Sequence, residues 1–414
     1  MFLLVNFIML AGMILSDTDF FLAGVGTKIK YLFMLYCIID IMQYKKINCS
    51  SNLIVLFTIL IAYVLLWRHV FVNHDMEEYI SSHTIIMIYY LLLLIPSVQE
   101  VLHYQCIREY TITSCAAVIV ALFIQVGTHL YELSFNPIFA VYSFLAHDIM
   151  RSNFGFLHAN FVGNVCFLII SFLIIFYMEF SDNPLQHSRS KIIVLLIGFI
   201  TFMILLSASS RTALISIIIF YLGTCAVRIM EKVRFTEKSK KILKWVFIIG
   251  LLFLVFVIFA SGLWDYIWVN SNRSLNVTEN VKWVPILGTI WTGMGFVENG
   301  AFISDPYNYN LSAFGVQTSS LDMNYLFIYC TTGILGCCMM ASILIILGVS
   351  LYKNRREKYG GYYLVLYFTL LFYAFWETIL FTYRQWAMII PHVILLYGSN
   401  IEKVTTETEH ASLN

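Results

Sequence analysis

Long apolar runs separated by short polar stretches make up most of this chain. A helix needs about 20 apolar residues to cross ~30 Å of hydrocarbon, and about twelve segments approach that length. The predicted spans are residues 1–15, 28–44, 52–72, 84–102, 110–131, 160–180, 190–208, 211–230, 242–264, 323–352, 360–381 and 386–401. Some are short or closely spaced, so about eleven or thirteen spans also fit. The pattern predicts an all-α polytopic membrane protein.

Two long polar stretches interrupt the pattern, at residues 132–159 and 265–322. The sequence has no visible internal repeat and no Pro-rich or Ser-rich linker, so we expect residues 1–414 to form a single polytopic membrane domain. The opening MFLLVNFIML lacks the basic region and the small-residue cleavage site of a signal peptide. We therefore expect it to remain as the first span.

Composition narrows the class of protein. With 60% hydrophobic and 12% charged residues, the chain cannot form a water-facing surface of ordinary polarity. A net charge of +1 argues against a nucleic-acid partner. The nine cysteines lie mostly inside apolar runs, which is not the pattern of a disulfide framework or a metal cluster.

The positions of Lys and Arg predict the orientation, because cytoplasmic loops carry an excess of both. With the N-terminus inside, 17 of the 25 Lys and Arg residues fall in inner loops. Both termini are then cytoplasmic, and the two long loops, 132–159 and 265–322, face outward. We expect any chemistry to lie on the outer face.

The stretch FGFLHANFVGN, Phe154 to Asn164, concentrates polar residues just before the sixth span. Arg151 precedes it, and His158 and Asn160 lie within it. These side chains could cap a helix or form hydrogen bonds between helices. They could equally line a site that binds a ligand.

A second polar cluster, in LLSASSRTALISIII, separates the seventh and eighth spans. Ser209, Ser210 and Arg211 form a turn too short to reach far into water, which keeps Arg211 near headgroup depth. The N–H groups and dipole at the start of the eighth helix also attract an anion. Arg211 is therefore either an anchor for a lipid phosphate or part of a phosphate-binding site.

Polar residues near the last spans have simple structural explanations. Asp322 and Asn324 open the tenth helix, where N-capping is the default role. Glu377 lies deep in the predicted eleventh span, where an acid normally has a partner. Arg384, seven residues on and about two turns along the same face, is the candidate partner.

The order of these features resembles the Wzy-type oligosaccharide repeat-unit polymerases of capsule and O-antigen synthesis, which are similar to the O-antigen ligases. The resemblance covers about Arg151 to Gly336 and rests mainly on R-x-x-F-G-F-x-H-x-N-x-x-G and S-x-S-R-T-A-L. The family often has Pro between the His and the Asn, where this chain has Ala159. The resemblance implies a GT-C-like fold in the bacterial cytoplasmic membrane.

The resemblance also implies glycosyl transfer between lipid-linked repeat units, with polyprenyl diphosphate as the leaving group. Arg151 and Arg211 would hold that diphosphate as negative charge develops on it, and Arg suits phosphate because it donates bidentately. His158 would be the base and Asp322 a reserve base. The remaining substrate-binding candidates are Asn160, Ser209, Ser210, Asn324, Glu377 and Arg384.

We expect neither a metal nor another cofactor. Asp17-Thr18-Asp19 matches a D-x-D metal motif, but such a tripeptide arises easily by chance, and two Arg are available for the diphosphate. The expected partners are lipid-linked repeat units and membrane lipids, with other capsule-assembly membrane proteins as further candidates. The loop 265–322, rich in Asn, Ser, Tyr and Trp with Gly293 and Gly295 near its middle, is a candidate sugar-binding lid.

Two alternatives stay open. An O-antigen ligase-type transferase would share the fold and the Arg and His residues, and it would differ only in its acceptor. A lipid-linked oligosaccharide flippase or transporter would show paired halves and interrupted helices in matching positions. The concentration of polar residues in two outward loops favours the enzyme.

Overall fold

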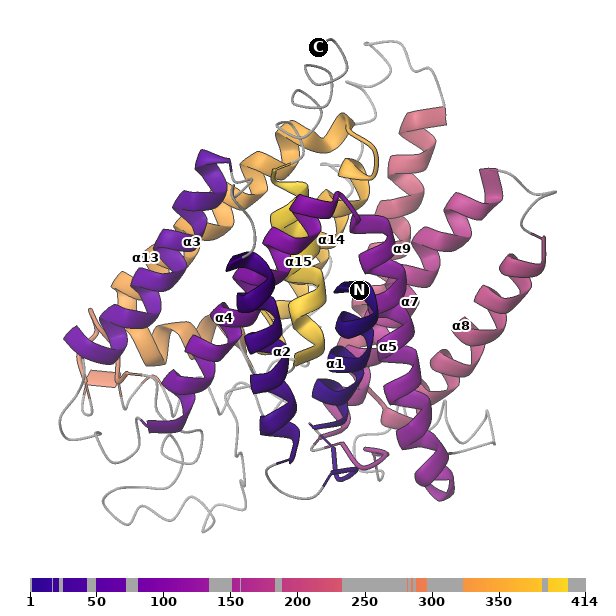
Figure 1. Ribbon diagram of the computed structural model, residues 1–414, viewed down its shortest axis with the longest axis horizontal. Helices are drawn as coiled ribbons and strands as arrows, with labels where there is room; N and C mark the ends of the chain where they lie inside the picture. Colours follow the sequence, from indigo (N-terminus) through magenta and orange to yellow (C-terminus); the bar gives the residue numbers. More distant parts are fainter. Residues whose placement is uncertain are drawn as a thin grey trace, which may run out of the picture. The chain divides into compact units, whose positions relative to one another are not determined.

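The computed structural model describes residues 2–16, 18–21, 25–42, 50–71, 81–133, 151–156, 158–182, 188–232, 281, 284–285, 288–295, 323–381 and 386–400. Within these ranges all extended regular structure is helical, and strand-like pairing is limited to the isolated bridges Thr18–Phe156 and Thr289–Gly293. The predicted all-α class is confirmed for this part of the chain (Figure 1).

The helices follow the apolar runs closely. The longer ones are α1 Phe2–Leu15, α2 Val25–Met42, α3 Ser51–Leu65, α4 Ser81–Tyr104, α5 Ile107–Thr128, α7 Ala159–Asp182, α8 Ser188–Ala208, α9 Arg211–Lys232, α13 Asn324–Lys353, α14 Gly360–Ala374 and α15 Ile389–Gly398. Short helical turns are η1 Leu66–Val70, η3 Leu130–Glu132, η6 Asn354–Arg356 and η7 Trp386–Met388. The predicted ninth span, 242–264, lies outside the described residues.

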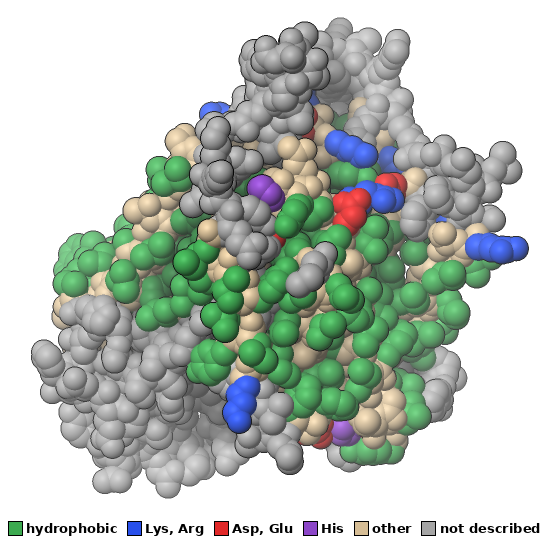
Figure 2. Space-filling view, viewed as in Figure 1, with side chains coloured by type: hydrophobic (Ala, Val, Ile, Leu, Met, Phe, Trp, Pro, Cys, Tyr) green, Lys and Arg blue, Asp and Glu red, His purple; other side chains and the backbone are tan. Residues whose placement is uncertain are grey.

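Five of the described helical segments are long and apolar enough to cross a membrane: 107–128, 159–179, 189–208, 211–230 and 324–356. The segments 2–15, 51–65, 360–374 and 386–398 are apolar but shorter. Hydrophobic side chains cover most of the described surface in Figure 2, and charged side chains there are few. The chain is therefore a helical membrane protein, and the count of twelve spans stays a prediction.

The chain packs as two compact units. Unit 1 comprises residues 1–64, 85–224 and 340–414, and unit 2 comprises residues 65–84 and 225–339.

In unit 1, α1 and α5 run side by side in the same direction (Figure 1). The rings of Phe2 and Tyr110 stack at 6.5 Å, and the Asn6 amide donates a hydrogen bond of 3.1 Å to the Ser114 hydroxyl. Both side chains are buried, so this bond gives the Asn6 NH2 group and the Ser114 hydroxyl a partner among apolar helices, where an unpaired polar group is costly.

Helix α7 packs against α8. Contacts toward each end of α7 show that α14 runs antiparallel to it. Near the start of α7, the Phe167 ring meets the Tyr373 ring edge-on at 5.0 Å. Near the end of α7, the Tyr359 hydroxyl donates to Glu179 Oε1 at 2.9 Å. Arg108 Nε donates to the same oxygen at 3.2 Å, which ties the start of α5 to this cluster.

The structure corrects the expected position of Glu377. Helix α14 ends at Ala374 and not near residue 381, because the N–H groups of Phe375 and Trp376 bond to carbonyls three residues back and tighten the last turn. Glu377 follows this turn, is 6% exposed, and its N–H donates to the Tyr373 carbonyl at 3.0 Å. Its candidate partner Arg384 lies outside the described residues.

In unit 2, α13 is broken at Gly333, whose backbone has φ 61° and ψ −161°. The segment 288–295 lies against the break and forms a hairpin, in which Thr289 and Gly293 exchange two backbone hydrogen bonds. A Cβ on Gly293 would lie 2.6 Å from the Thr331 carbonyl carbon, so only glycine allows this approach.

Carbonyl groups of hairpin 288–295 accept hydrogen bonds from the N–H groups that the break in α13 releases. In an unbroken helix, the N–H groups of Ile334 and Leu335 would bond to the carbonyls four residues back. They donate instead to the carbonyls of Ile290 and Trp291, each at 3.0 Å.

The hairpin also supplies donors to the released carbonyls. The carbonyls of Cys330 and Thr331 accept from the N–H groups of Met294 and Gly295, at 2.9 and 2.8 Å. Four backbone bonds to the hairpin thus replace two helical ones. Gly293 and Gly295 join the hairpin to α13, and most of loop 265–322, the candidate sugar-binding lid, lies outside the described residues.

The Tyr359–Glu179 contact predicts a pH effect. Burial, followed by the hydrogen bond and the charge of Glu179, raises the pKa of Tyr359 from 10.0 to about 12. Because the folded pKa exceeds the unfolded one, this contribution to stability is complete below pH 10 and is lost as pH rises toward 12. Tyr359→Phe should lower the free energy of unfolding by about 0.5–1.5 kcal/mol at pH 8 and flatten its fall above pH 10. Thermal unfolding in detergent measures both; Tyr352→Phe is the control, and an unchanged pH profile for Tyr359→Phe would contradict the assignment.

Candidate functional site

Arg151 joins the two sequence stretches that were singled out for their polar residues. Its Nη2 donates to Asn160 Oδ1 at 2.6 Å, and its Nε donates to the Ala208 carbonyl at 3.2 Å. Asn160 lies in the first turn of α7, and Ala208 is the last residue of α8. One guanidinium therefore fixes the start of α7 against the end of α8.

His158 stands just before α7 and is held by a bond that settles its tautomer. Its Nδ1 accepts the backbone N–H of Asn160 at 3.1 Å. Since an amide N–H can only donate, Nδ1 carries no proton, and the neutral ring carries its proton on Nε2. The exposed ring is thus arranged as an Nε2–H donor, whereas the sequence led us to expect a base.

The turn between α8 and α9 is tight and buried. Ser209 adopts a positive φ of 51°, and its N–H donates to the Leu206 carbonyl at 3.0 Å. The Ser210 carbonyl accepts from the Leu214 N–H at 3.2 Å, so α9 begins at Arg211. Arg211 is partly exposed and lies three residues after Ala208, the residue to which Arg151 bonds.

A glycine lets this turn lie directly against α7. A Cβ on Gly163 would be 2.1 Å from the Ser210 hydroxyl oxygen, a distance that the buried Ser210 could not accommodate without moving. The small residue is therefore required by the close packing of the α8–α9 turn on α7.

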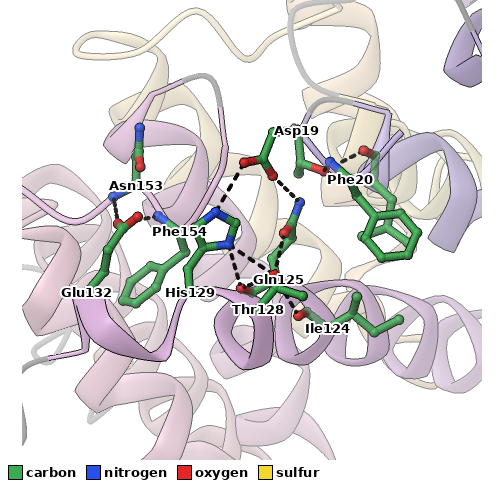
Figure 3. A network of polar contacts seen from close by, with 11 residues as sticks. Asp19, Phe20, Ile124, Gln125, Thr128, His129, Glu132, Asn153 and Phe154 are labelled. Carbon is green, nitrogen blue, oxygen red and sulfur yellow. Dashed lines mark hydrogen bonds and ion pairs between the residues drawn. The ribbon is translucent and has the colours of Figure 1, made fainter. Parts of the chain in front are cut away.

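Glu132, in the turn that follows α5, holds the segment that carries Arg151. Its Oε2 accepts the backbone N–H groups of Asn153 and Phe154 at 3.0 and 2.8 Å (Figure 3). Its own carbonyl accepts the Ser152 hydroxyl at 2.8 Å. Glu132 was not predicted from the sequence, because a carboxylate that bonds backbone N–H groups leaves no side-chain pattern there.

Asp19, which follows α1, holds the same segment from the other side. Its Oδ2 lies 3.1 Å from His129 Nε2, and its Oδ1 accepts the Gln125 amide at 3.3 Å (Figure 3). Its backbone N–H donates to the Gly155 carbonyl at 2.9 Å. Gly155 has φ 74°, and a Cβ there would lie 2.3 Å from Asp19 Oδ1. The carboxylate of the D-x-D tripeptide is thus engaged within the fold, and Asp17 lies outside the described residues.

Asn164 has a structural role. Its Oδ1 accepts a hydrogen bond from the Tyr373 hydroxyl, and both side chains are buried. This bond links α7 to α14.

The predicted site residues fall into three groups. The structure brings together Arg151, His158, Asn160, Ser209, Ser210 and Arg211 at one end of unit 1. Asn324 is buried as the first residue of α13, in unit 2, and Glu377 is buried after α14 in unit 1. Asp322 and Arg384 lie outside the described residues.

This end of unit 1 is suited to an anion. Two helices, α7 and α9, begin there, and the N–H groups and dipole of a helix N-terminus favour negative charge. Arg151 and Arg211 add two cations beside those N-termini. Because α7, α8 and α9 are long enough to span a membrane, the cluster lies where lipid headgroups would be.

Comparisons with the models of known protein families and with curated proteins gave no match.

The contact between Gly163 and Ser210 predicts opposite effects for two glycine substitutions. Gly163→Ala should destabilise the protein by about 1–3 kcal/mol, because the added methyl group overlaps Ser210. Gly198→Ala is the matched control: its Cβ would lie 3.8 Å from Leu173, an ordinary contact, so helix propensity should stabilise it by about 0.5–1 kcal/mol. Thermal unfolding in one detergent tests both, and equal stability of the two variants would contradict the close packing.

Proposed function

We propose that this chain is a membrane glycosyltransferase that joins polyprenyl-diphosphate-linked oligosaccharide repeat units on the outer face of the bacterial cytoplasmic membrane. The observation that carries the proposal is the bridge from Arg151 to Asn160 and Ala208, which places two helix N-termini and two Arg at one end of membrane-spanning helices. The proposal also includes twelve spans, cytoplasmic termini, a GT-C-like fold and metal independence.

The reaction needs cations at the diphosphate. The bond between the anomeric carbon and the diphosphate oxygen breaks, and the electron pair stays on the diphosphate. The negative charge that develops there is stabilised by donors fixed in place before the reaction. Arg151 is fixed by Asn160 and Ala208, and Arg211 begins α9 three residues after Ala208. In this proposal the two guanidinium groups hold the leaving group.

The tautomer of His158 gives it a different role in the mechanism from the one first expected. With its proton on Nε2, the ring donates a hydrogen bond to a substrate oxygen and helps to orient the substrate. The acceptor hydroxyl forms the new bond to the anomeric carbon and must lose its proton. Asp322, the reserve base from the sequence, is the candidate that receives it.

The described structure offers an argument against one of the two alternatives, the flippase or transporter, and none against the other. An O-antigen ligase-type transferase uses the same anion site and stays the closest alternative. For a flippase or transporter, the break in α13 is the kind of feature expected. However, the backbone groups released there bond to hairpin 288–295, which argues against their use for a transported substrate.

The glycan profile of cells lacking this chain separates the three activities. Loss of polymer with single repeat units still attached to their final acceptor is expected for a polymerase. Loss of all attachment while free polymer continues to form would indicate a ligase. Accumulation of lipid-linked units on the cytoplasmic side would indicate a flippase and contradict the proposal.

Arg211 provides a direct test of the leaving-group role. Arg211→Ala should lower turnover by about 10²–10³, the usual effect of removing one fixed donor from an oxyanion site. Arg211→Lys keeps the charge but loses the planar fork, so its turnover should lie between that of the wild type and that of the Ala variant. Polymer formation from purified lipid-linked repeat units, at matched protein levels, measures this. A simple lipid anchor would leave Arg211→Lys fully active.

His158 variants distinguish a hydrogen-bond donor from a base. His158→Ala removes the Nε2–H donor and should lower turnover by about 10²–10³, the usual effect of losing one fixed donor. His158→Gln keeps an N–H donor but cannot act as a base near neutral pH, so it should retain clearly more activity than the Ala variant. The same polymer assay measures both, and equally severe losses in the two variants would return the base role to His158.

A further inference from the structure

Hairpin 288–295 lies within the stretch that the sequence placed in a water-facing loop, yet two of its three exposed residues, Ile290 and Trp291, are apolar. Ile290 is 46% exposed and Trp291 is 62% exposed. Leu335, whose N–H bonds to the Trp291 carbonyl, is 41% exposed beside them. Together they form a small apolar surface at the joint between the hairpin and α13.

We propose that this surface contacts lipid, with Ile290 and Trp291 embedded in the membrane interface. The partner is the phospholipid bilayer itself. The proposal does not depend on the glycosyltransferase activity.

The length of α13 places the joint at the membrane surface. The helix Asn324–Lys353 has 30 residues, about 45 Å at 1.5 Å per residue, whereas the hydrocarbon core is ~30 Å thick. The part after Gly333, about 20 residues, is long enough to cross on its own. The break then coincides with the edge of the hydrocarbon, which is the depth that Trp side chains prefer.

Helix α13 also carries exposed apolar side chains after the break. Ile345 and Val349, four residues apart and so on one side of the helix, are 64% and 50% exposed. Exposed apolar side chains along one side of a spanning helix are those that face lipid.

The backbone of the hairpin tip is bonded, as contact with lipid requires. The carbonyls of Ile290 and Trp291 accept from α13, and the Thr292 carbonyl accepts the Trp67 indole N–H at 2.6 Å. The Thr292 N–H donates to the Thr289 hydroxyl at 3.0 Å. The tip can therefore enter an apolar environment without exposing these groups.

Fluorescence in brominated vesicles tests the proposal. The full chain is reconstituted in phosphatidylcholine whose acyl chains carry bromine either close to the headgroup or near the chain end. Subtracting the emission of the Trp291→Phe variant from that of the wild type gives the emission of Trp291 alone. This component should be mostly lost in the lipid brominated near the headgroup, less affected in the other, and insensitive to aqueous iodide.

Two variants complete the test. Trp386→Phe removes a buried Trp, so the difference it isolates should be little quenched by either lipid. Ile290→Trp, made in the Trp291→Phe protein, should reproduce the pattern of Trp291 and guards against an altered fold in one variant. The proposal is overturned if the emission from residues 290 and 291 survives in both brominated lipids. Quenching by iodide would then place the residues in water, and no quenching by iodide would place them under a protein cover.

Discussion

The proposed site depends on the two hydrogen bonds of the Arg151 guanidinium. One bond reaches Asn160 in the first turn of α7 and the other reaches the carbonyl that ends α8. Hydrogen bonds to a charged group contribute about 1.5–3 kcal/mol, enough to hold two helix ends in one arrangement. Glu132 and Asp19 then fix the segment that carries Arg151 through its backbone, so helices α1 and α5 contribute to the site without entering it.

Both units follow the rule that backbone groups near hydrocarbon must be bonded within the protein. In unit 2, the break at Gly333 interrupts two backbone hydrogen bonds of α13. Hairpin 288–295 bonds all four of the N–H and carbonyl groups that these two bonds would have paired. In unit 1, the His158 ring accepts an N–H at the start of α7. Because Nδ1 accepts this bond, the proton of the His158 ring lies on Nε2, and the ring is a hydrogen-bond donor.

Hydropathy predicted the helices and their connections well, because the thickness of a membrane sets the length of an apolar run. Helix α8 ends and α9 begins where the Ser-rich turn predicts. Since consecutive spans alternate in direction, the starts of the sixth and eighth spans were expected at one membrane face. Arg151 bonds to the start of α7 and to Ala208, which ends α8 just before α9 begins. Periodicity does not show where a helix stops early, so Glu377 was placed inside a helix that ends at Ala374. Contacts to backbone atoms, such as those of Glu132 and hairpin 288–295, could not be predicted from the sequence either.

Binding of the leaving group alone tests the central claim most directly. The purified chain in lipid nanodiscs would be titrated with polyprenyl diphosphate and with polyprenyl monophosphate. The account predicts tighter binding of the diphosphate, by about tenfold for each ~1.4 kcal/mol of added interaction. Arg151→Ala and Arg211→Ala should remove the preference, while Arg108→Ala, at the opposite end of unit 1, should retain it. Equal affinity of the wild-type protein for the two lipids would contradict a diphosphate site at the start of α7 and α9.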